Sequence, residues 1–280
     1  MLKLDTITSS SIASPPVVFQ KLQDAINDSD STFEDFANVI SLDPGLSLRV
    51  LGFVNSSFYS FPNRVDSILQ AVNILGVDQI MNLSTGTLVM NRFKSISKEL
   101  ISLEAFWKHS VACGLATKEI AVLFGETKNL EQYFLLGLLH DIGSLVLLIE
   151  NPTISQACFK KAGDESRRLY EVEKEIIGFS HENLGGELLR KWGLADCFFQ
   201  SVNFHHNPFK TPRKYRKIAC WLHIADTIAY EIGWGNSGEP IVPCFDQKAV
   251  EFLLLNEEKI TDIRESLKHS FDDIFKIFYS

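Results

Sequence analysis

Histidine and aspartate side chains dispersed over the later part of the chain are the residues whose types and spacing could do chemistry. The set consists of His109, His140, Asp141, His181, His205, His206 and Asp226. Imidazole and carboxylate ligands suit first-row metals such as iron, manganese, nickel and zinc. A single histidine on a helix is more often a partly buried side chain than a metal ligand, so each isolated position is a weak signal.

The adjacent pair His140 and Asp141 is a stronger signal, because it interrupts one of the most apolar segments of the sequence, from Tyr133 to Ile149. Burying an ionised aspartate beside an imidazole is costly unless a partner or a metal compensates the charge. The residues alone leave both interpretations open. The segment is too short and too polar at its centre to span a bilayer, which predicts a buried helical region and no membrane association.

Residues typical of helix starts and helix ends recur along the whole chain. Ser31 and Glu34 form a capping-box pattern, Asp43 precedes a proline that opens a helix, and Gly76 stands where a helix would end. Beyond about residue 100 the apolar periodicity predicts helices at 103–123, 130–148, 153–177, 181–192, 195–206, 214–233, 246–256 and 259–278. Sustained alternation of apolar and polar residues, the pattern typical of strands, is absent from the sequence. We therefore predict an all-α fold.

The polar segment from Lys94 to Ser102 is the expected boundary between two packed helical subdomains, residues 1–96 and 97–280. The sequence has 27 basic and 35 acidic side chains. The resulting net charge of −8 disfavours binding to nucleic acid or an anionic membrane. The five cysteines are odd in number and widely spaced, which favours reduced thiols and a cytoplasmic location.

The order of His109, the pair His140 and Asp141, and Asp226 resembles the dispersed H…HD…D signature of the HD superfamily of metal-dependent phosphohydrolases. Most of the chain also resembles the HDOD branch, the HD-related output domain of bacterial signalling proteins. The segments that carry this resemblance are Ser14–Val17, Leu42–Leu46, Val54–Tyr59, Ile74–Gly76, Phe106–His109, Gly137–Gly143 and His181–Leu194. The resemblance implies a C-terminal subdomain built as an HD-like helical bundle.

The remaining histidines extend the resemblance to the HD-GYP cyclic-dinucleotide phosphodiesterases, where His181, His205 and His206 would be additional metal ligands. The resemblance then implies two divalent transition metals joined by the carboxylate of Asp141. The ligands of the first metal would be His109, His140, Asp141 and Asp226. Two metals that share a carboxylate and a hydroxide provide a nucleophile at neutral pH, and in an active enzyme Asp141 and His140 would be the catalytic residues.

Three positions depart from active relatives. Asn207 stands where HD-GYP proteins are expected to carry a glutamate, Ser144 stands where a lysine or arginine often meets substrate phosphate, and Ala105 replaces the glutamate of three-metal relatives. We therefore expect a signal-transduction HDOD protein that retains its metal site and acts mainly through a signalling protein partner. The alternative is an active phosphohydrolase on a nucleotide or cyclic dinucleotide.

Two further features concern the surroundings of this set. Lys210, Arg213 and Lys214 belong to a basic run just after the histidine pair and are candidate contacts for a small phosphorylated ligand, although a solvated loop is the ordinary interpretation. His223 lies three residues before Asp226, and we expect it to support a ligand rather than to bind metal.

Overall fold

The computed structural model describes residues 3–10, 12–93 and 101–279. Within these ranges there are helices and no strands, which confirms the all-α prediction. In chain order the elements are α1 (Leu4–Ile7), α2 (Val17–Asn27), α3 (Phe33–Ser41), α4 (Pro44–Val54), α5 (Ile68–Leu75), α6 (Val77–Arg92), α7 (Leu103–Leu123), α8 (Leu130–Leu139), α9 (Ile142–Glu150), α10 (Pro152–Glu165), α11 (Leu169–Ile177), α12 (His181–Lys191), α13 (Asp196–Asn203), the 3₁₀ helix η1 (Pro208–Lys210), α14 (Arg216–Ile232), α15 (Gln247–Phe252) and α16 (Glu257–Tyr279).

The short N-terminal helices begin and end at residues with clear capping roles. Asp43 caps α4 by accepting a hydrogen bond from the backbone of Leu46 at 3.0 Å, and Gly76 ends α5 at a φ of 91° that favours glycine. The predicted capping box at Ser31 is wrong by one residue, because Thr32 and Asp35 form it instead. Their side chains and backbone amides bond reciprocally, which fixes the first turn of α3.

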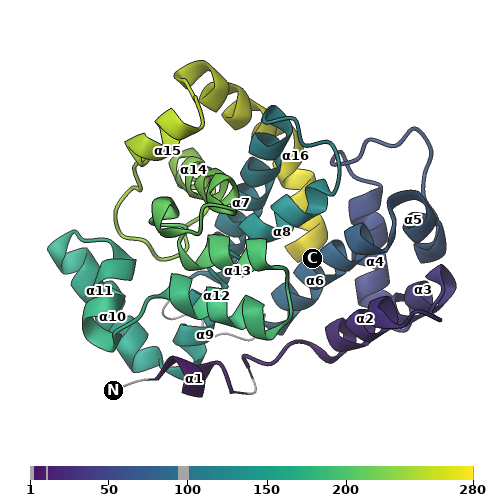
Figure 1. Ribbon diagram of the computed structural model, residues 1–280, viewed down its shortest axis with the longest axis horizontal. Coiled ribbons are helices and arrows are strands. Elements are labelled where there is room, and N and C mark those ends of the chain that lie inside the picture. Colours follow the sequence, from purple (N-terminus) through teal and green to yellow (C-terminus); the bar gives the residue numbers. More distant parts are fainter. Residues whose placement is uncertain (1–2, 11, 94–100, 280) are drawn as a thin grey trace.

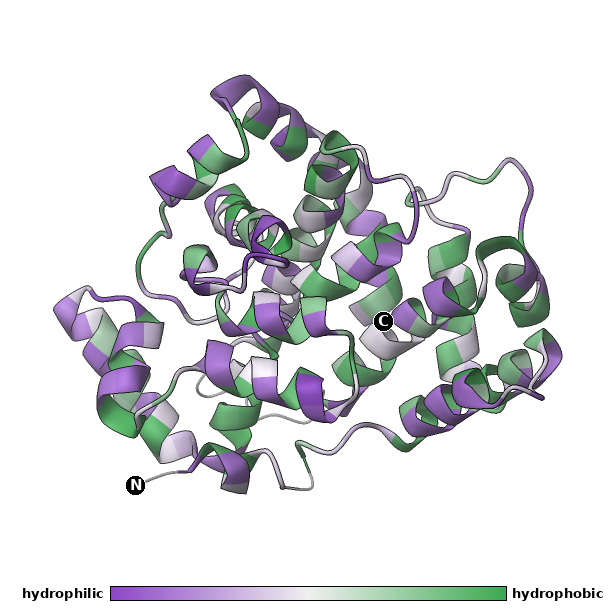
Figure 2. Cartoon of the chain, viewed as in Figure 1, coloured by the Kyte–Doolittle hydropathy of each residue, from purple (hydrophilic) through white to green (hydrophobic). Residues whose placement is uncertain are grey.

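Helix α7 is central to the packing, and α8, α14 and α16 all lie against it (Figure 1). Helices α2 and α3 carry hydrophilic and hydrophobic residues in alternation, as expected of helices with one face on a core (Figure 2). The last helix, α16, also contacts α4, so the C-terminal end of the chain returns to the N-terminal helices.

The N-terminal residues in turn pack against the C-terminal part. The indole Nε1 of Trp192 donates to the carbonyl of Ala13 at 2.7 Å, and Lys191 donates to the hydroxyl of Thr8 at 2.7 Å. One cluster of buried apolar side chains extends over both parts of the chain. The two-subdomain division stays a prediction, and its boundary at residue 96 lies among residues 94–100, outside the described ranges.

Two glycines allow helices to touch backbone to backbone. A Cβ at Gly137 in α8 would lie 2.5 Å from the carbonyl oxygen of Cys113 in α7. A Cβ at Gly143 in α9 would lie 2.1 Å from the carbonyl oxygen of His181 in α12. Both distances are far below van der Waals contact, so only glycine permits these helix pairs to approach as they do.

The apolar segment Leu130–Glu150 is long enough to cross a membrane by length and composition, but 89% of its most apolar stretch is buried inside the fold. Such burial is typical of a core segment in a soluble domain. The segment is not one helix as predicted, since α8 ends at Leu139 and α9 begins at Ile142. The helix predicted at 153–177 is also interrupted, at Ser166, whose φ is 50°.

Candidate metal centre

The predicted ligands converge in space from five parts of the chain. They come from α7 (His109), the α8–α9 break (His140 and Asp141), the first residue of α12 (His181), the segment after α13 (His205 and His206) and α14 (Asp226). All are buried except His206, which is partly buried. The interruption of the apolar segment thus places two of these polar side chains where other helices bring the rest.

One group of three side chains gathers around the carboxylate of Asp226. Its Oδ1 atom lies 3.1 Å from Nε2 of His109 and 3.5 Å from Nε2 of His140. Candidate ligand atoms from these three residues all lie within 4.8 Å of one another. This spacing permits one metal ion to contact all three side chains after small adjustments.

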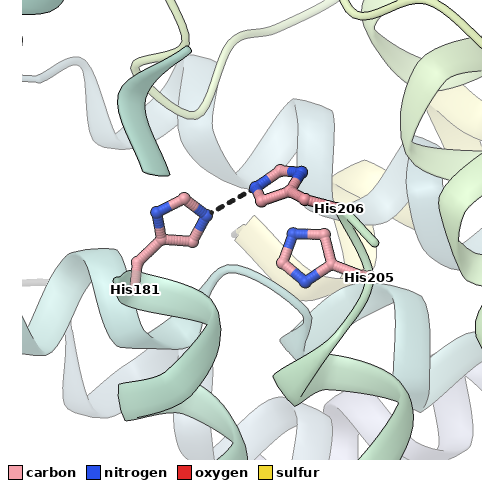
Figure 3. Close-up of side chains that lie close together, drawn as sticks. All are labelled: His181, His205 and His206. Atoms are coloured by element: carbon pink, nitrogen blue, oxygen red, sulfur yellow. Dashed lines mark hydrogen bonds between the residues drawn. The ribbon is translucent and has the colours of Figure 1, made fainter. Parts of the chain in front are cut away.

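A second group consists of His181, His205 and His206 (Figure 3). Their ligand atoms also lie within 4.8 Å of one another, and the Nε2 atoms of His181 and His206 approach to 2.9 Å. Figure 3 shows these two rings pointing toward each other from separate elements. Three imidazoles in this arrangement form a second candidate metal site.

Asp141 lies between the two groups and presents one oxygen to each. Its Oδ2 atom is 3.1 Å from Nε2 of His140, in the first group. Its Oδ1 atom is 3.4 Å from Nε2 of His181 and 3.5 Å from Nε2 of His205, in the second group. The carboxylate is therefore positioned to bridge two ions.

Two of the imidazoles are oriented by hydrogen bonds on the side away from the cluster. Nδ1 of His140 bonds the carbonyl of Gly137 at 2.7 Å, and Nδ1 of His205 bonds the carbonyl of Val202 at 2.8 Å. A carbonyl only accepts, so each Nδ1 carries a proton, and Nε2 is the nitrogen that faces the cluster. This is the tautomer and the orientation that a metal ligand requires.

Several atoms that face the centre of the cluster are buried without a hydrogen-bond partner among the described residues. They are Nε2 of His109, Nε2 of His140, Nε2 of His205 and Oδ1 of Asp141. Buried polar atoms without partners are rare and destabilising, and a bound metal would satisfy all four. The donor set and its unsatisfied atoms therefore fit divalent transition metals.

The charges within the cluster are strongly coupled. Burial would raise the pKa of Asp141, but the imidazoles around it outweigh burial and lower the pKa well below the usual range. Burial would likewise lower the pKa of His140, but the charge of Asp141 raises it well above the usual range. Burial and two neighbouring imidazoles lower the pKa of His206. Protons shared among these groups must leave when metal binds, so we expect metal affinity to rise with pH.

His223 contacts the backbone beside the ligands. Its Nε2 accepts from the backbone N–H of Asp246 at 2.9 Å, and its Nδ1 then donates to the carbonyl of His205 at 2.9 Å. Burial lowers the pKa of His223, consistent with a neutral ring in this role. These contacts hold the segment that carries the histidine pair, which is the supporting role expected from the sequence.

Two cavities lie beside the cluster. The inner one, about 10 Å³, is lined by residues that include Asp141, His181, Arg168, Tyr230 and Glu239. This volume suffices for about one water molecule. The outer cavity, about 240 Å³, is lined by residues that include Arg168.

The basic residues named from the sequence are placed elsewhere. Lys210, Arg213 and Lys214 are exposed and line neither cavity. Arg168, which the sequence did not single out, lines both cavities. Arg168 lies where the helix predicted at 153–177 is interrupted, between α10 and α11. Because this interruption was not predicted, the sequence did not indicate that Arg168 lies beside the cavities.

Sequence reasoning also missed Glu173, a buried residue of α11. Its Oε2 atom accepts from the backbone N–H of His181 at 2.8 Å and bonds Nδ1 of the same residue at 2.7 Å. The negative charge outweighs the effect of burial and raises the pKa of His181 to about 10. The sequence does contain a signal for this residue, namely a glutamate on an otherwise apolar helix face. Glu173 shares the buried face of α11 with Leu169, Val172 and Ile177.

An all-α fold with a convergent H…HD…D set defines an HD-type helical protein. A family model for the HDOD domain matches residues 12–208, which is more than half of the sequence. The chain therefore belongs to the HDOD family. The match includes every candidate ligand except Asp226, which lies beyond its end.

Solved structures share this fold over nearly the whole chain. A Shewanella amazonensis SB2B protein described as "Putative phosphohydrolase" is 23% identical, with a TM-score of 0.76 over 98% of this chain and 97% of that one. A Geobacter sulfurreducens "HDOD domain protein with unknown function" is 24% identical, with a TM-score of 0.69 over 98% and 93%. A second S. amazonensis protein, "Putative metal-dependent phosphohydrolase", is 20% identical, with a TM-score of 0.62 over 92% and 91%.

Among curated proteins, an "Uncharacterized protein" of Treponema pallidum (strain Nichols) is 22% identical over 259 residues. The match covers 92% of this chain and 49% of the relative, so the chain spans about half the length of that protein.

Proposed function

We propose that this chain is a cytoplasmic regulatory protein of bacterial signal transduction that holds two divalent transition metals and acts mainly through a protein partner. The observation that carries the proposal is the carboxylate of Asp141, which faces two groups of ligand atoms at once. Membership of the HDOD family supports the signalling role.

The metal centre would be held by the two groups already described, with Asp141 between them. Bound metals would supply Lewis acidity and a further structural link among helices that packing and hydrogen bonds already join. The chain's own residues supply preorganisation, since carbonyl oxygens and Glu173 fix the ligand imidazoles before metal arrives.

A regulatory role is favoured over catalysis by the surroundings of the centre. The inner cavity holds about one water and has Ser237, Glu239 and Pro243 on its wall, so a nucleotide has no room beside Asp141 in this conformation. Ser144 also lines this cavity, in place of the cation that active relatives are expected to present. Such a centre is suited to holding the helices in one arrangement.

The second candidate function is a metal-dependent phosphohydrolase acting on a nucleotide or a cyclic dinucleotide. The water-sized cavity beside Asp141 favours it, because hydrolysis needs a water at the bridging carboxylate. In that case Asp141 and His140 would be catalytic, and the cover of the cavity would have to move.

Elemental analysis of full-length protein purified without chelator tests the shared premise, with two metal ions per chain as the expected result. Asp141→Ala should lose bound metal and lower the thermal unfolding midpoint. For a regulatory protein, neither form should hydrolyse a generic phosphodiester or a cyclic dinucleotide. Turnover by metal-loaded wild type that disappears in Asp141→Ala would replace the regulatory proposal with the enzymatic one. A metal-free wild type would overturn both.

A further inference from the structure

A third cavity, of about 310 Å³, shares no lining residue with the two cavities beside the metal centre. Its walls come from α2 and α6 among the N-terminal helices, and from the start of α8 and the turn between α12 and α13. The polar side chains that line it are five carboxamides and one carboxylate: Gln23, Asn27, Asn82, Asn129, Gln132 and Asp78. The described residues around it include no lysine, arginine or histidine.

The polar lining includes pairs of residues that share one face of a helix. Gln23 and Asn27 in α2 stand at positions i and i+4, and so do Asp78 and Asn82 in α6. The side chains of Asn27, Asn82 and Asp78 have no hydrogen-bond or ion-pair partner among the described residues. Two helices therefore each present a row of polar groups to the cavity, with donors and acceptors available for a ligand.

Two hydrogen bonds connect the walls of the cavity to one another. Nε2 of Gln23 in α2 donates to the carbonyl of Trp192 at 2.9 Å, at the end of α12. Nε2 of Gln79 in α6 donates to Oδ1 of Asn129 at 2.6 Å, at the start of α8. These bonds hold the N-terminal helices to the later part of the chain, so the cavity is already formed before a ligand binds.

The remainder of the lining is apolar apart from its backbone. It includes Ile26, Met81 and Phe198, of which Met81 and Phe198 are buried and Ile26 is 38% exposed. Asp78 supplies the single charge among the described residues of the lining. The cavity thus combines hydrogen-bonding groups with an apolar wall and one negative charge.

We infer that this cavity binds an extended segment of a partner protein in which a lysine or arginine adjoins an apolar residue. The inference rests on the proposed function, because it supplies a contact site for the protein partner. A carboxamide has a carbonyl and N–H groups, as a peptide group has, so rows of carboxamides match successive backbone groups of an extended segment. The carboxylate of Asp78 would pair with the basic residue, and the wall around Met81 would receive the apolar one.

The size and charge of the cavity favour this occupant over others. A volume of about 310 Å³ is near the lower limit of the roughly 300–1,000 Å³ typical of ligand sites, so the cavity takes a few residues and not the face of a folded domain. A nucleic acid or a phosphorylated ligand is disfavoured, because Asp78 repels phosphate and no cation among the described lining residues attracts it.

An array of short synthetic peptides of random sequence, probed with full-length protein purified without chelator, tests the inference. Peptides in which a lysine or arginine adjoins a leucine, isoleucine, phenylalanine or methionine should dominate the bound set. The affinity of the strongest of them is then measured by fluorescence anisotropy. Asp78→Asn should weaken its binding about two- to fivefold, because it removes an exposed ion pair. Asn82→Leu should weaken binding about three- to tenfold, because it removes hydrogen bonds to the peptide.

Each variant has a matched control outside the cavity. Asp24→Asn removes an exposed aspartate of α2, and Asn91→Leu replaces another half-buried asparagine of α6. Both controls should bind the peptide as wild type does. Replacing the basic residue of the peptide with glutamine should weaken binding to wild type as much as Asp78→Asn does, and should leave binding to Asp78→Asn unchanged.

Unfolding midpoint and metal content are measured on every protein, and Asp78→Asn, at an exposed position, keeps the test decisive if Asn82→Leu fails to fold. Wild type that selects no peptides, or selects acidic ones, would overturn the inference, as would equal losses in the variants and their controls. If that wild type holds metal and hydrolyses nothing, the proposed regulatory function stands without this contact site. A dimer of the chain that Asn82→Leu dissociates would assign the cavity to a second copy and would also overturn the inference.

Discussion

Glu239 lies in the wall of the inner cavity, where its ionisation opposes folding. The residue is 7% exposed, and both carboxylate oxygens lie 3.2 Å from the backbone nitrogen of Leu169, whose N–H they accept. Burial raises the pKa of Glu239 from 4.5 to about 7. Glu239→Gln removes the ionisation and keeps an acceptor for the same N–H.

The sign of the effect follows from the two pKa values. In the unfolded chain the carboxyl loses its proton near pH 4.5, whereas in the folded protein it keeps the proton to about pH 7. Between these values the folded state binds more protons, so its stability falls as pH rises. The difference corresponds to about 3 kcal/mol, most of which is lost between pH 5 and pH 8.

Urea unfolding of wild type and Glu239→Gln at pH 5 and pH 8, with chelator present to exclude metal effects, measures this directly. We expect the free energy of unfolding of the variant to gain about 2 to 3 kcal/mol relative to wild type on going from pH 5 to pH 8. Comparing the two proteins at each pH cancels the titration of other groups. Parallel pH dependences would refute the argument that the buried carboxyl is protonated in the folded protein.

Other positions give equally direct tests. Gly143→Ala places a methyl group against the carbonyl of His181, so we expect a loss of about 3 kcal/mol in urea unfolding, together with loss of metal. Normal stability would show that the two helices can separate. Tyr59→Phe removes the 2.6 Å hydrogen bond to buried Glu131 and should cost about 1 to 3 kcal/mol, read from the denaturation midpoint. Glu173→Gln removes the charge that orients His181 and should weaken metal affinity about 10- to 100-fold in a chelator competition. An unchanged affinity would mean that Glu173 only supports the fold.

The candidate metal ligands were predictable because their residue types stand out at a few positions. The charge of an aspartate beside a histidine within an apolar segment has to be compensated, so His140 and Asp141 stand out in the sequence alone. The structure brings the predicted ligands together. It also shows that the chain changes direction at His140 and Asp141, between α8 and α9. As a result, Gly137 in α8 contacts α7 and Gly143 in α9 contacts α12.

The surroundings of the centre were less predictable because they depend on contacts between distant segments. Lys210 belongs to the most basic run near the histidine pair, yet its side chain is exposed, whereas Arg168 reaches both cavities from a different part of the sequence. Ser166, which separates α10 from α11, has a left-handed backbone conformation. A glycine would have indicated this conformation in the sequence, but a serine does not. Helical periodicity continues across the break, so the sequence does not show that Arg168 lies beside the cavities.

The contact between Gly143 and the carbonyl of His181 has a mechanical consequence. Backbone atoms meet backbone atoms there, so α9 and α12 cannot rock against each other without breaking close packing. Asp141 and His181, each within two residues of that contact, consequently behave as parts of one rigid body.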